Sequence, residues 1–379
     1  MVENIRSIPA AGQIAAPDPT RFGRATVKVL GLGGGGSNAV NRMIEIGLSG
    51  VDFIAANTDR QALSSSLAPS RIQLGPRITR GLGAGGDPKI GTAAAMESSR
   101  EIAAALSGAD MVFITAGMGG GTGTGSAAVA AEIAREVGAV VIAVVTMPFG
   151  FEMVRRSQNA TEGVRLLQPH THTLITVPND RLLQVIPRDV NLEVAFRLAD
   201  DVLRQGIQGI SELITKPGMI NVDFANVRQL MLHGGGALMS IGLGEGPSKA
   251  GDAIGQALHH PLLEVDSLGQ ASGVLVHFTG GEDLTLHEVG QAVTDLRESL
   301  DPDAEIILGA TTEPEMDGRA QVILIVTGIG GRPLNSIIRP QVVESVDRLA
   351  SVTLHTTQGP SVDTDLDLPA FLRRRVASA

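Results

Sequence analysis

The sequence predicts an α/β fold in which a parallel β-sheet with helices on both faces is joined by a long central helix to a smaller α+β domain. Apolar runs of strand length alternate with helical patterns through the first half of the chain. The chain has 379 residues, 43% of them hydrophobic, which is enough for two domains and a large core. Glycine supplies 47 residues, about 12% of the chain, against about 7% in an average protein. The backbone must therefore stay free of side chains at many positions.

The composition excludes several classes of function. A formal charge of −10 argues against nucleic acid as a partner. Without cysteine the chain has no disulfide, thiolate metal site or cysteine nucleophile. No apolar run approaches the roughly 20 residues of a membrane span, and the first residues lack the apolar stretch of a secretion signal. We expect a cytoplasmic protein that neither binds nucleic acid nor spans a membrane.

The first domain is predicted over residues 25–190, after a disordered extension at residues 1–24 that is rich in proline, alanine and polar residues. Its predicted strands are residues 26–30, 51–56, 111–115 and 140–146, and its predicted helices follow the first glycine loop up to residue 46 and cover residues 91–106 and 126–137. Right-handed crossovers put every strand-to-helix loop at the carboxyl edge of such a sheet, where ligands bind.

The longest helical pattern runs from residue 191 to residue 216 and stops at Pro217. With the loop that follows, it forms a central segment at residues 191–222. A smaller α+β domain is predicted at residues 223–330, with strands at 237–243, 273–279, 304–308 and 321–327 and helices near 248–259 and 285–299. A linker at residues 331–365 and a terminal peptide at residues 366–379, which combines apolar and basic residues, complete the chain.

Three glycine-rich loops lie where strands meet helices, at residues 31–38, 81–88 and 117–125. Bare backbone amides at a helix N-terminus suit a phosphate group. The P-loop sequence G-x-x-x-x-G-K-S/T is absent, and neither the first nor the last of these loops holds lysine or arginine. Amides, helix dipoles and a bound cation must therefore carry the phosphate charge.

Two ligand classes fit these loops. Gly31, Gly33 and Gly36 match the dinucleotide fingerprint, with Asp52 or Asp59 at the ribose-reading distance, and this pattern is typical of a nicotinamide-dependent oxidoreductase. A simple dinucleotide fold has no need of the second phosphate cradle at residues 117–125. That cradle favours a nucleoside triphosphate, together with the glycine loop at residues 81–88 and residues 57–59 after the second predicted strand. Flexible or surface turns remain the alternative for each glycine loop.

At this point the sequence resembles the FtsZ family, the bacterial relatives of tubulin. The segment at residues 117–125 looks like the family signature GGGTGTG, and the likeness extends from about residue 24 to residue 330. The other matching segments, in family order, are residues 57–59, 177–180, 221–225 and 284–288. Residues 368–374 resemble the FtsZ tail peptide, which tubulins lack.

The resemblance implies a Rossmann-like domain that binds GTP or GDP, with Mg²⁺ on the phosphates and no metal held by protein side chains alone. It also implies the residues that contact the nucleotide. These are Gly34, Gly35, Gly36, Ser37, Asn38, Asn57, Asp59, Gly85, Gly86, Gly119, Gly120, Gly121, Thr122, Gly123, Thr146, Glu152, Arg156, Asn179, Phe196, Asp200 and Asp201.

Among these residues, two pairs at i,i+4 spacing have side chains whose chemistry suits the implied contacts. Glu152 and Arg156, which the resemblance assigns to the ribose and phosphates, are expected on one face of a helix, where a plain ion pair is the alternative. Phe196 can stack on a base, although its spacing alone favours the core. The carboxylate of Asp200 can accept the two N–H donors of guanine, and Asp201 is a second candidate.

The resemblance further implies head-to-tail filaments in which the loop after the long helix completes the GTP site of the next subunit. The residues expected to act there are Asn221, Asp223 and Asn226. The family usually has an acidic residue at the last position, and an amide cannot accept a proton from water. We therefore expect GTP hydrolysis weakened by about 10²-fold. The alternative is a catalytically poor structural paralogue that copolymerises with an active homologue.

The terminal peptide is expected to bind a partner through Leu368, Pro369, Phe371, Leu372, Arg373 and Arg374. In the family this peptide docks membrane-tethering division proteins, which implies a filament beneath the membrane at the mid-cell division site and a role in septation. A frayed terminus is the alternative. His170 and His172 are expected on one face of a strand, as a surface pair rather than a metal site.

Overall fold

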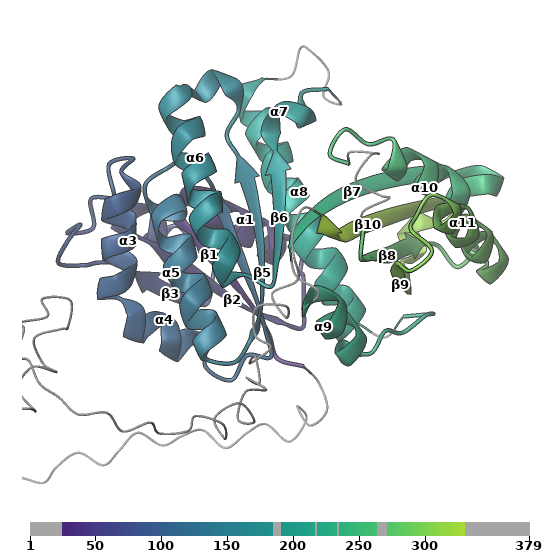
Figure 1. Ribbon diagram of the computed structural model, residues 1–379, viewed down its shortest axis with the longest axis horizontal. Helices are drawn as coiled ribbons and strands as arrows, with labels where there is room; N and C mark the ends of the chain where they lie inside the picture. The colour runs from purple at the N-terminus through teal and green to yellow at the C-terminus, as the bar shows by residue number, and fades with distance from the viewer. Residues whose placement is uncertain (1–24, 185–190, 217, 233–234, 264–270, 330–379) are drawn as a thin grey trace, which may run out of the picture. The chain divides into compact units, whose positions relative to one another are not determined.

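The computed structural model describes residues 25–184, 191–216, 218–232, 235–263 and 271–329 (Figure 1). The expected N-terminal extension, the linker and the terminal peptide lie outside the described residues. Within the described part no helix is long and apolar enough to cross a membrane.

One mixed β-sheet of ten strands runs through the described residues, in the order β3-β2-β1-β4-β5-β6-β7-β10-β8-β9. The strands are β1 Val27–Leu32, β2 Val51–Asn57, β3 Ser70–Gln73, β4 Met111–Gly117, β5 Val140–Met147, β6 Thr173–Pro178, β7 Gly236–Glu245, β8 Gly273–Gly280, β9 Glu305–Thr312 and β10 Arg319–Ile329. From β3 to β7 all neighbours pair in parallel, and β10 pairs antiparallel with β7 and β8. The parallel first half and the mixed second half confirm the predicted fold.

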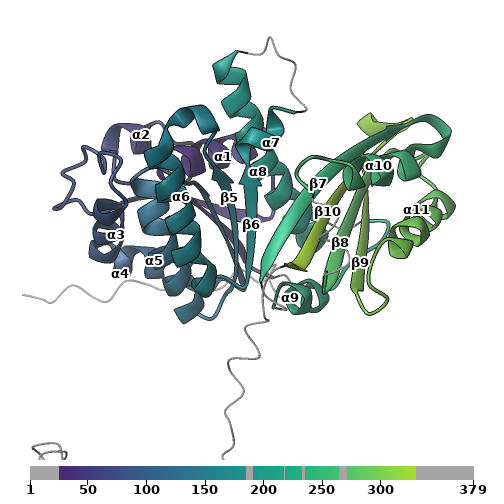
Figure 2. The same ribbon diagram turned by 45° about the horizontal axis from the view of Figure 1, so that its top comes forward.

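The helices cover both faces of the sheet (Figures 1 and 2). They are α1 Gly33–Glu45, α2 Arg60–Ser64, α3 Pro88–Glu97, α4 Ser99–Leu106, α5 Thr122–Glu136, α6 Val154–Leu167, α7 Asn179–Leu182, α8 Leu192–Thr215, α9 Phe224–Leu232, α10 Lys249–Leu258 and α11 Leu286–Glu298, with short 3₁₀ helices η2 Gly150–Glu152, η3 Gln168–His170, η4 Gly246–Ser248 and η6 Pro314–Met316.

The helix expected over residues 91–106 is two helices, α3 and α4, that meet at Ser98. The buried Ser98 hydroxyl accepts the backbone N–H of Gly75 at 3.0 Å and donates to the carbonyl of Gln73 at 3.2 Å. These contacts tie the break to the end of β3, which is a tertiary effect that helical periodicity does not report.

Strand β5 shows how the two faces are formed. Val140, Ile142 and Val144 pack into the core on the side of α1 and α8, and the alternate residues Val141 and Val145 pack on the side of α3 to α6. Burial of each such side chain contributes about 1.5–3 kcal/mol. A third cluster lies between the strands of the second half and helices α10 and α11.

The long helix α8 spans 24 residues, about 36 Å at 1.5 Å per residue. The Asn191 side chain caps its start by accepting the N–H of Val194 at 2.9 Å. A Cβ at Gly206 would lie 2.6 Å from Met239 Sδ, and one at Gly209 would lie 2.8 Å from Ile323 Cδ1. These glycines let α8 approach the sheet closely, and the stripe that includes Leu203, Ile207 and Ile210 is buried against it.

Candidate nucleotide-binding site

A cavity of about 390 Å³ opens at the carboxyl ends of β1, β4 and β5, where the sequence placed the ligand. Its lining combines glycine backbone, one ion pair, an aromatic ring and a carboxylate. The residues are Gly34, Gly35, Asn38, Gly117, Met118, Gly120, Gly121, Thr122, Gly123, Thr146, Pro148, Glu152, Arg156, Asn179, Phe196, Ala199 and Asp200. A cavity of this size and mixed polarity is typical of a small-molecule site.

The first glycine loop contains glycines with two different tasks. A Cβ at Gly36 would lie 2.3 Å from the Thr115 carbonyl oxygen, and one at Gly31 would lie 2.4 Å from the Gly36 carbonyl oxygen. These two glycines permit close packing of β1, α1 and β4. A Cβ at Gly34 would meet nothing within 4 Å, because this residue faces the cavity. The loop therefore packs through some glycines and presents bare backbone to a ligand through another.

The second glycine loop, at residues 117–125, is held by threonine hydroxyl groups. The Gly119 N–H donates to Thr124 Oγ1 at 2.8 Å, and Thr122 Oγ1 lies 2.6 Å from Thr58 Oγ1 of the loop after β2. Gly119 has a φ of 101°, which side chains rarely adopt, and a Cβ there would lie 2.8 Å from the Arg156 carbonyl oxygen. Gly120 faces open space, as Gly34 does.

Both glycine loops lead into helices whose first turns lack a capping side chain. No side-chain cap bond is present at Leu32 before α1 or at Gly121 before α5. The free N–H groups of a first turn, together with the positive end of the helix dipole, favour an anion. Two helix N-termini at one cavity therefore form a phosphate-binding site built from backbone.

An aromatic cluster forms another wall of the site. The ring of Phe149 is buried, stacks on Phe151 at 5.0 Å between centroids and meets Phe196 edge-to-face at 5.4 Å. Phe196 is 37% exposed and lines the cavity, so its face is accessible to a planar group. The Oδ1 atom of Asn179 is buried there without a hydrogen-bond partner among the described residues.

Glu152 and Arg156 form the expected ion pair, but they do not share one helix. Glu152 ends η2, and α6 begins at Val154 after Met153, whose φ of 81° separates the two. The Glu152 carboxylate also accepts the N–H of Phe149 at 2.9 Å. The prediction of a single helix across this pair was wrong. Both side chains line the cavity, and their contact with the ribose and phosphates stays a prediction beside the plain ion pair.

The adjacent acids of α8 have different partners. Asp201 accepts hydrogen bonds from Arg204 Nε at 2.6 Å and from Gln205 Nε2 at 2.5 Å. Burial raises the pKa of Asp201, but these hydrogen bonds and the charges of Arg204 and Arg42 lower it by more, so that its pKa lies below the ordinary value. Asp200 lines the cavity, and burial raises its pKa to about 6 against the opposing charge of Arg42.

Some of the sequence-predicted residues lie outside the cavity lining. They are Gly36, Ser37, Asn57, Asp59, Gly85, Gly86, Gly119 and Asp201. Asp59 instead caps α2 by accepting the N–H groups of Gln61 and Ala62, and Asn57 Oδ1 accepts the N–H of Asp59 at 3.1 Å.

Sequence reasoning did not name four of the lining residues, namely Gly117, Met118, Pro148 and Ala199. Gly117 belongs to the second glycine loop, which the sequence did single out. The other three stand next to or near named residues and carry no chemical signature of their own, so only the fold reveals that they face the cavity.

The third glycine loop, at residues 81–88, leads into α3 and lies beside the loop at residues 117–125. The amide of Asn159 on α6 donates to the carbonyls of Gly86 at 3.4 Å and Gly119 at 3.3 Å. Asp87 caps α3 through its side chain. The loop thus supports the signature loop from outside, and neither Gly85 nor Gly86 lines the cavity.

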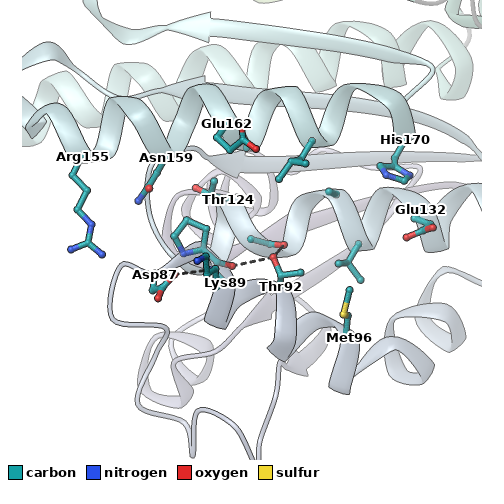
Figure 3. Close-up of a pocket in the computed structure, with 16 residues that line it drawn as sticks. Asp87, Lys89, Thr92, Met96, Thr124, Glu132, Arg155, Asn159, Glu162 and His170 are labelled. Carbon is teal, nitrogen blue, oxygen red and sulfur yellow. Dashed lines mark hydrogen bonds between the residues drawn. The ribbon is translucent and has the colours of Figure 1, made fainter.

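A second hollow, of about 470 Å³, lies between α3, α5 and α6. Figure 3 shows Arg155 and Asn159 toward one end and Glu132 and His170 toward the other. It shares no lining residue with the cavity at the glycine loops. The hollow is therefore a separate feature of the same domain.

The loop after α8 places its polar residues at the surface. Asn221, Asp223 and Asn226 are all exposed. The Asn221 side chain accepts the N–H of Gly218 at 2.7 Å, and the Asp223 carbonyl accepts the N–H of Asn226 at 3.0 Å as α9 begins. None of the three lines the cavity of the same chain.

The two histidines are not part of a strand, and this prediction was wrong. His170 ends η3, and His172 precedes β6. His172 Nδ1 accepts the N–H of Val141 at 2.9 Å. Burial, together with the charges of Arg135 and Arg228, lowers the pKa of His172 to about 4, so this ring is a neutral structural acceptor.

Taken together, the paired helix N-termini, the accessible ring and the facing carboxylate define a nucleotide-binding α/β protein. Family models refine this class. Residues 26–187 match the Tubulin/FtsZ family, GTPase domain, and residues 235–330 match the FtsZ family, C-terminal domain. The chain belongs to the FtsZ family.

Solved structures agree with this assignment. The FtsZ dimer of M. jannaschii has 46% sequence identity and a TM-score of 0.79, over 82% of this chain and 90% of that one. A mutant of M. jannaschii FtsZ has 46% identity and a TM-score of 0.78, over 81% and 92%. CetZ2 from Haloferax volcanii, a GTPγS-bound protofilament, shares the fold at 21% identity and a TM-score of 0.67, over 82% and 96%.

The chain is therefore a GTP-binding cytoskeletal protein of a self-associating GTPase family that binds GTP and GDP. These findings replace the nicotinamide-dependent oxidoreductase alternative.

Proposed function

We propose that the chain assembles head to tail and hydrolyses GTP to GDP and phosphate at the junction between subunits. The supporting observation is the incomplete chemistry of the cavity. Its carboxylates are Glu152, which is paired with Arg156, and Asp200, which lies next to Phe196 on α8. Glu152 is occupied by Arg156, and we assign Asp200 to the base, so we propose that the proton acceptor comes from another subunit.

The exposed residues after α8 are the proposed source of that acceptor. Asp223 is a solvent-facing carboxylate at the start of α9, and Asn221 and Asn226 flank it. In a head-to-tail contact this loop would meet the phosphate end of the next subunit's cavity. A single subunit then binds GTP but hydrolyses it slowly.

Within the cavity we assign the phosphates to the amides around Gly34 and Gly120, the ribose to Glu152 and Arg156, and the base to Phe196 with Asp200. Among the described residues, Arg156 is the one cationic side chain of the lining. This charge is small against a triphosphate, so the chemistry of the donor set fits a Mg²⁺ ion held by phosphate oxygens and water. The ion supplies charge neutralisation, while the chain orients the phosphates.

A complementation experiment tests the junction. Gly34→Asp adds a negative charge to the phosphate cradle, and Asp223→Ala removes the proposed acceptor. Each variant alone is expected to lose phosphate release, and their mixture is expected to recover part of it, because the intact cavity of one meets the intact loop of the other. A mixture as inactive as its components would contradict assembly of the active site from two subunits.

We also propose that Asn226 weakens hydrolysis by about 10²-fold, because an amide holds water without accepting its proton. A second candidate follows from the same exposed residue: a catalytically poor structural paralogue that copolymerises with an active homologue. Phosphate release measured with and without a homologue that carries a fully acidic loop separates the two, since only the paralogue is inactive by itself.

For the terminal peptide we propose docking of membrane-tethering division proteins through Leu368, Pro369, Phe371, Leu372, Arg373 and Arg374, with the filament beneath the membrane at the division site. Apolar anchors beside a basic cluster support this role. Deletion of residues 366–379 is expected to abolish partner binding and to spare sedimentation with GTP. Equal loss of both would contradict a separate docking role.

A further inference from the structure

Arg42 lies on the third turn of α1, outside the cavity lining. It contacts Asp200 at the end of the cavity that we assign to the nucleotide base. Its Nε atom is 3.5 Å from Asp200 Oδ2. The two side chains are 28% and 15% exposed, so the pair is largely withdrawn from water. Screening is weak at such a site, and the charge of Arg42 acts strongly on Asp200.

This contact engages at most one of the two Asp200 oxygens. Arg42 Nε lies 3.5 Å from Asp200 Oδ2, which is long for a hydrogen bond, and the contact helps to lower the pKa of the carboxyl. Asp201, by contrast, accepts hydrogen bonds from Arg204 and Gln205. Of the two adjacent acids, Asp200 is the one that lines the cavity.

The ionisation of Asp200 depends on this arrangement. Burial raises its pKa to about 6, the neighbouring charge of Asp201 adds to the rise, and Arg42 opposes both. Arg42 comes from α1 and Asp201 from α8, and the remaining charged groups of the cavity, Glu152 and Arg156, form their own pair. Without Arg42 the carboxyl would hold its proton to higher pH, and a protonated carboxyl cannot accept from both donors of guanine.

We propose that Arg42 is a positioning residue for base recognition, which holds Asp200 charged and aimed at the cavity while engaging no more than one of its oxygens. This inference rests on the proposed assignment of Asp200 to the base. Arg42 thereby sets the preference for guanine over bases that offer fewer N–H donors, although it does not touch the nucleotide.

The test compares nucleotide binding by the full chain and its variants as pH changes. Arg42→Met, Arg42→Lys and the matched control Arg204→Met are titrated with GTP and with inosine triphosphate, which lacks the 2-amino donor, at about pH 6 and about pH 8.5. For Arg42→Met the affinity for GTP is expected to fall about fivefold at about pH 6, which is the loss of ionised carboxylate when a pKa of about 6 rises by about one unit, and to recover at the higher pH. Arg42→Lys is expected to keep most of the preference, and Arg204→Met all of it.

Asp200→Asn distinguishes failure of this inference from failure of the assignment on which it rests. Loss of the GTP preference in Asp200→Asn, with no further change on adding Arg42→Met, supports the proposal. If Asp200→Asn keeps the preference, Asp200 does not read the base and the proposed assignment fails. If Asp200→Asn loses it while Arg42→Met keeps both the preference and the wild-type pH profile, the role of Arg42 is overturned. Thermal unfolding of each variant without nucleotide shows whether the fold is retained.

Discussion

Gly34 and Gly36 stand two residues apart in the same loop, and the structure gives them opposite sensitivities to an added methyl group. At Gly36 the new Cβ would lie 2.3 Å from the Thr115 carbonyl oxygen and 2.9 Å from the Gly31 carbonyl carbon. Both neighbours are backbone, which cannot rotate away. At Gly34 nothing lies within 4 Å, and neither residue has a positive φ.

These distances set the expected magnitudes. Overpacking of this kind destabilises by about 1–3 kcal/mol, which lowers the melting temperature by about 2–4 °C per kcal/mol in a domain of this size. Gly36→Ala is therefore expected to melt about 2–12 °C below the wild type. Gly34→Ala lies in the first turn of α1, where alanine is favoured over glycine by up to about 1 kcal/mol, so its melting temperature is expected to be unchanged or slightly raised.

The affinity for GTP is expected to be lowered in Gly34→Ala, the variant whose stability is retained. The Gly34 methyl group points into the phosphate cradle, and we expect about a tenfold loss of GTP affinity, or about 1.4 kcal/mol. Calorimetric melting without nucleotide and titration with GTP measure the two effects independently, which matters because bound ligand itself raises stability. Wild-type GTP affinity in Gly34→Ala, or a wild-type melting temperature in Gly36→Ala, would refute the division of tasks within the loop.

Three further predictions follow from single side chains. Asn226→Asp is expected to raise phosphate release about 10²-fold in assembled filaments and to leave the slow rate of dilute subunits unchanged; an unchanged rate in filaments would count against the role of this position. Phe196→Leu removes the accessible ring and is expected to weaken GTP binding by about 1–3 kcal/mol, with no loss of stability comparable to that of a core residue; equal affinity would argue against stacking. Burial lowers the pKa of His277 to about 4 against an ordinary 6.5, with the charge of Glu212 opposing this change and that of Lys216 adding to it. The folded state therefore binds fewer protons than the unfolded state between these values, and His277 is expected to lower stability by up to about 3 kcal/mol as pH drops from 6.5 to 4. Chemical denaturation across that range should show the slope, and His277→Asn should reduce it and leave the part that comes from His172.

The sequence was informative wherever local chemistry and periodicity agreed. The alternation of strands and helices predicted the parallel half of the sheet, and the glycine loops predicted the edge at which the cavity opens. The i,i+4 spacing brought Phe196 and Asp200 to one side of α8, where both line the cavity. In each case a few neighbouring residues determine the outcome.

The failures share a physical reason, which is that distant groups decide them. Ser98 breaks a helix because its hydroxyl bonds to the residues after β3. The capping of α2 by the Asp59 carboxylate was likewise not predicted, and the nucleotide contact of Asp59 stays a prediction. Asp200 and Asp201 differ in their hydrogen-bond partners and pKa because Arg42 faces the first and Arg204 binds the second. Arg42 lies 158 residues from Asp200 in the chain. Periodicity carries no information about such partners.

The distribution of acids around the cavity gives a reason for coupling hydrolysis to assembly. Arg156 and the Phe149 amide occupy the Glu152 carboxylate through an ion pair and a hydrogen bond, and we assign Asp200 to the base. Neither carboxylate is therefore assigned to the attacking water. Asp223, by contrast, is exposed and lies on a loop that does not reach its own cavity. We propose that such a chain binds GTP as a monomer and acquires an acceptor on contact with another copy, so that assembly precedes hydrolysis. In this proposal Asn226, three residues after Asp223, slows only the step that follows assembly and so lengthens the time for which a filament keeps its GTP.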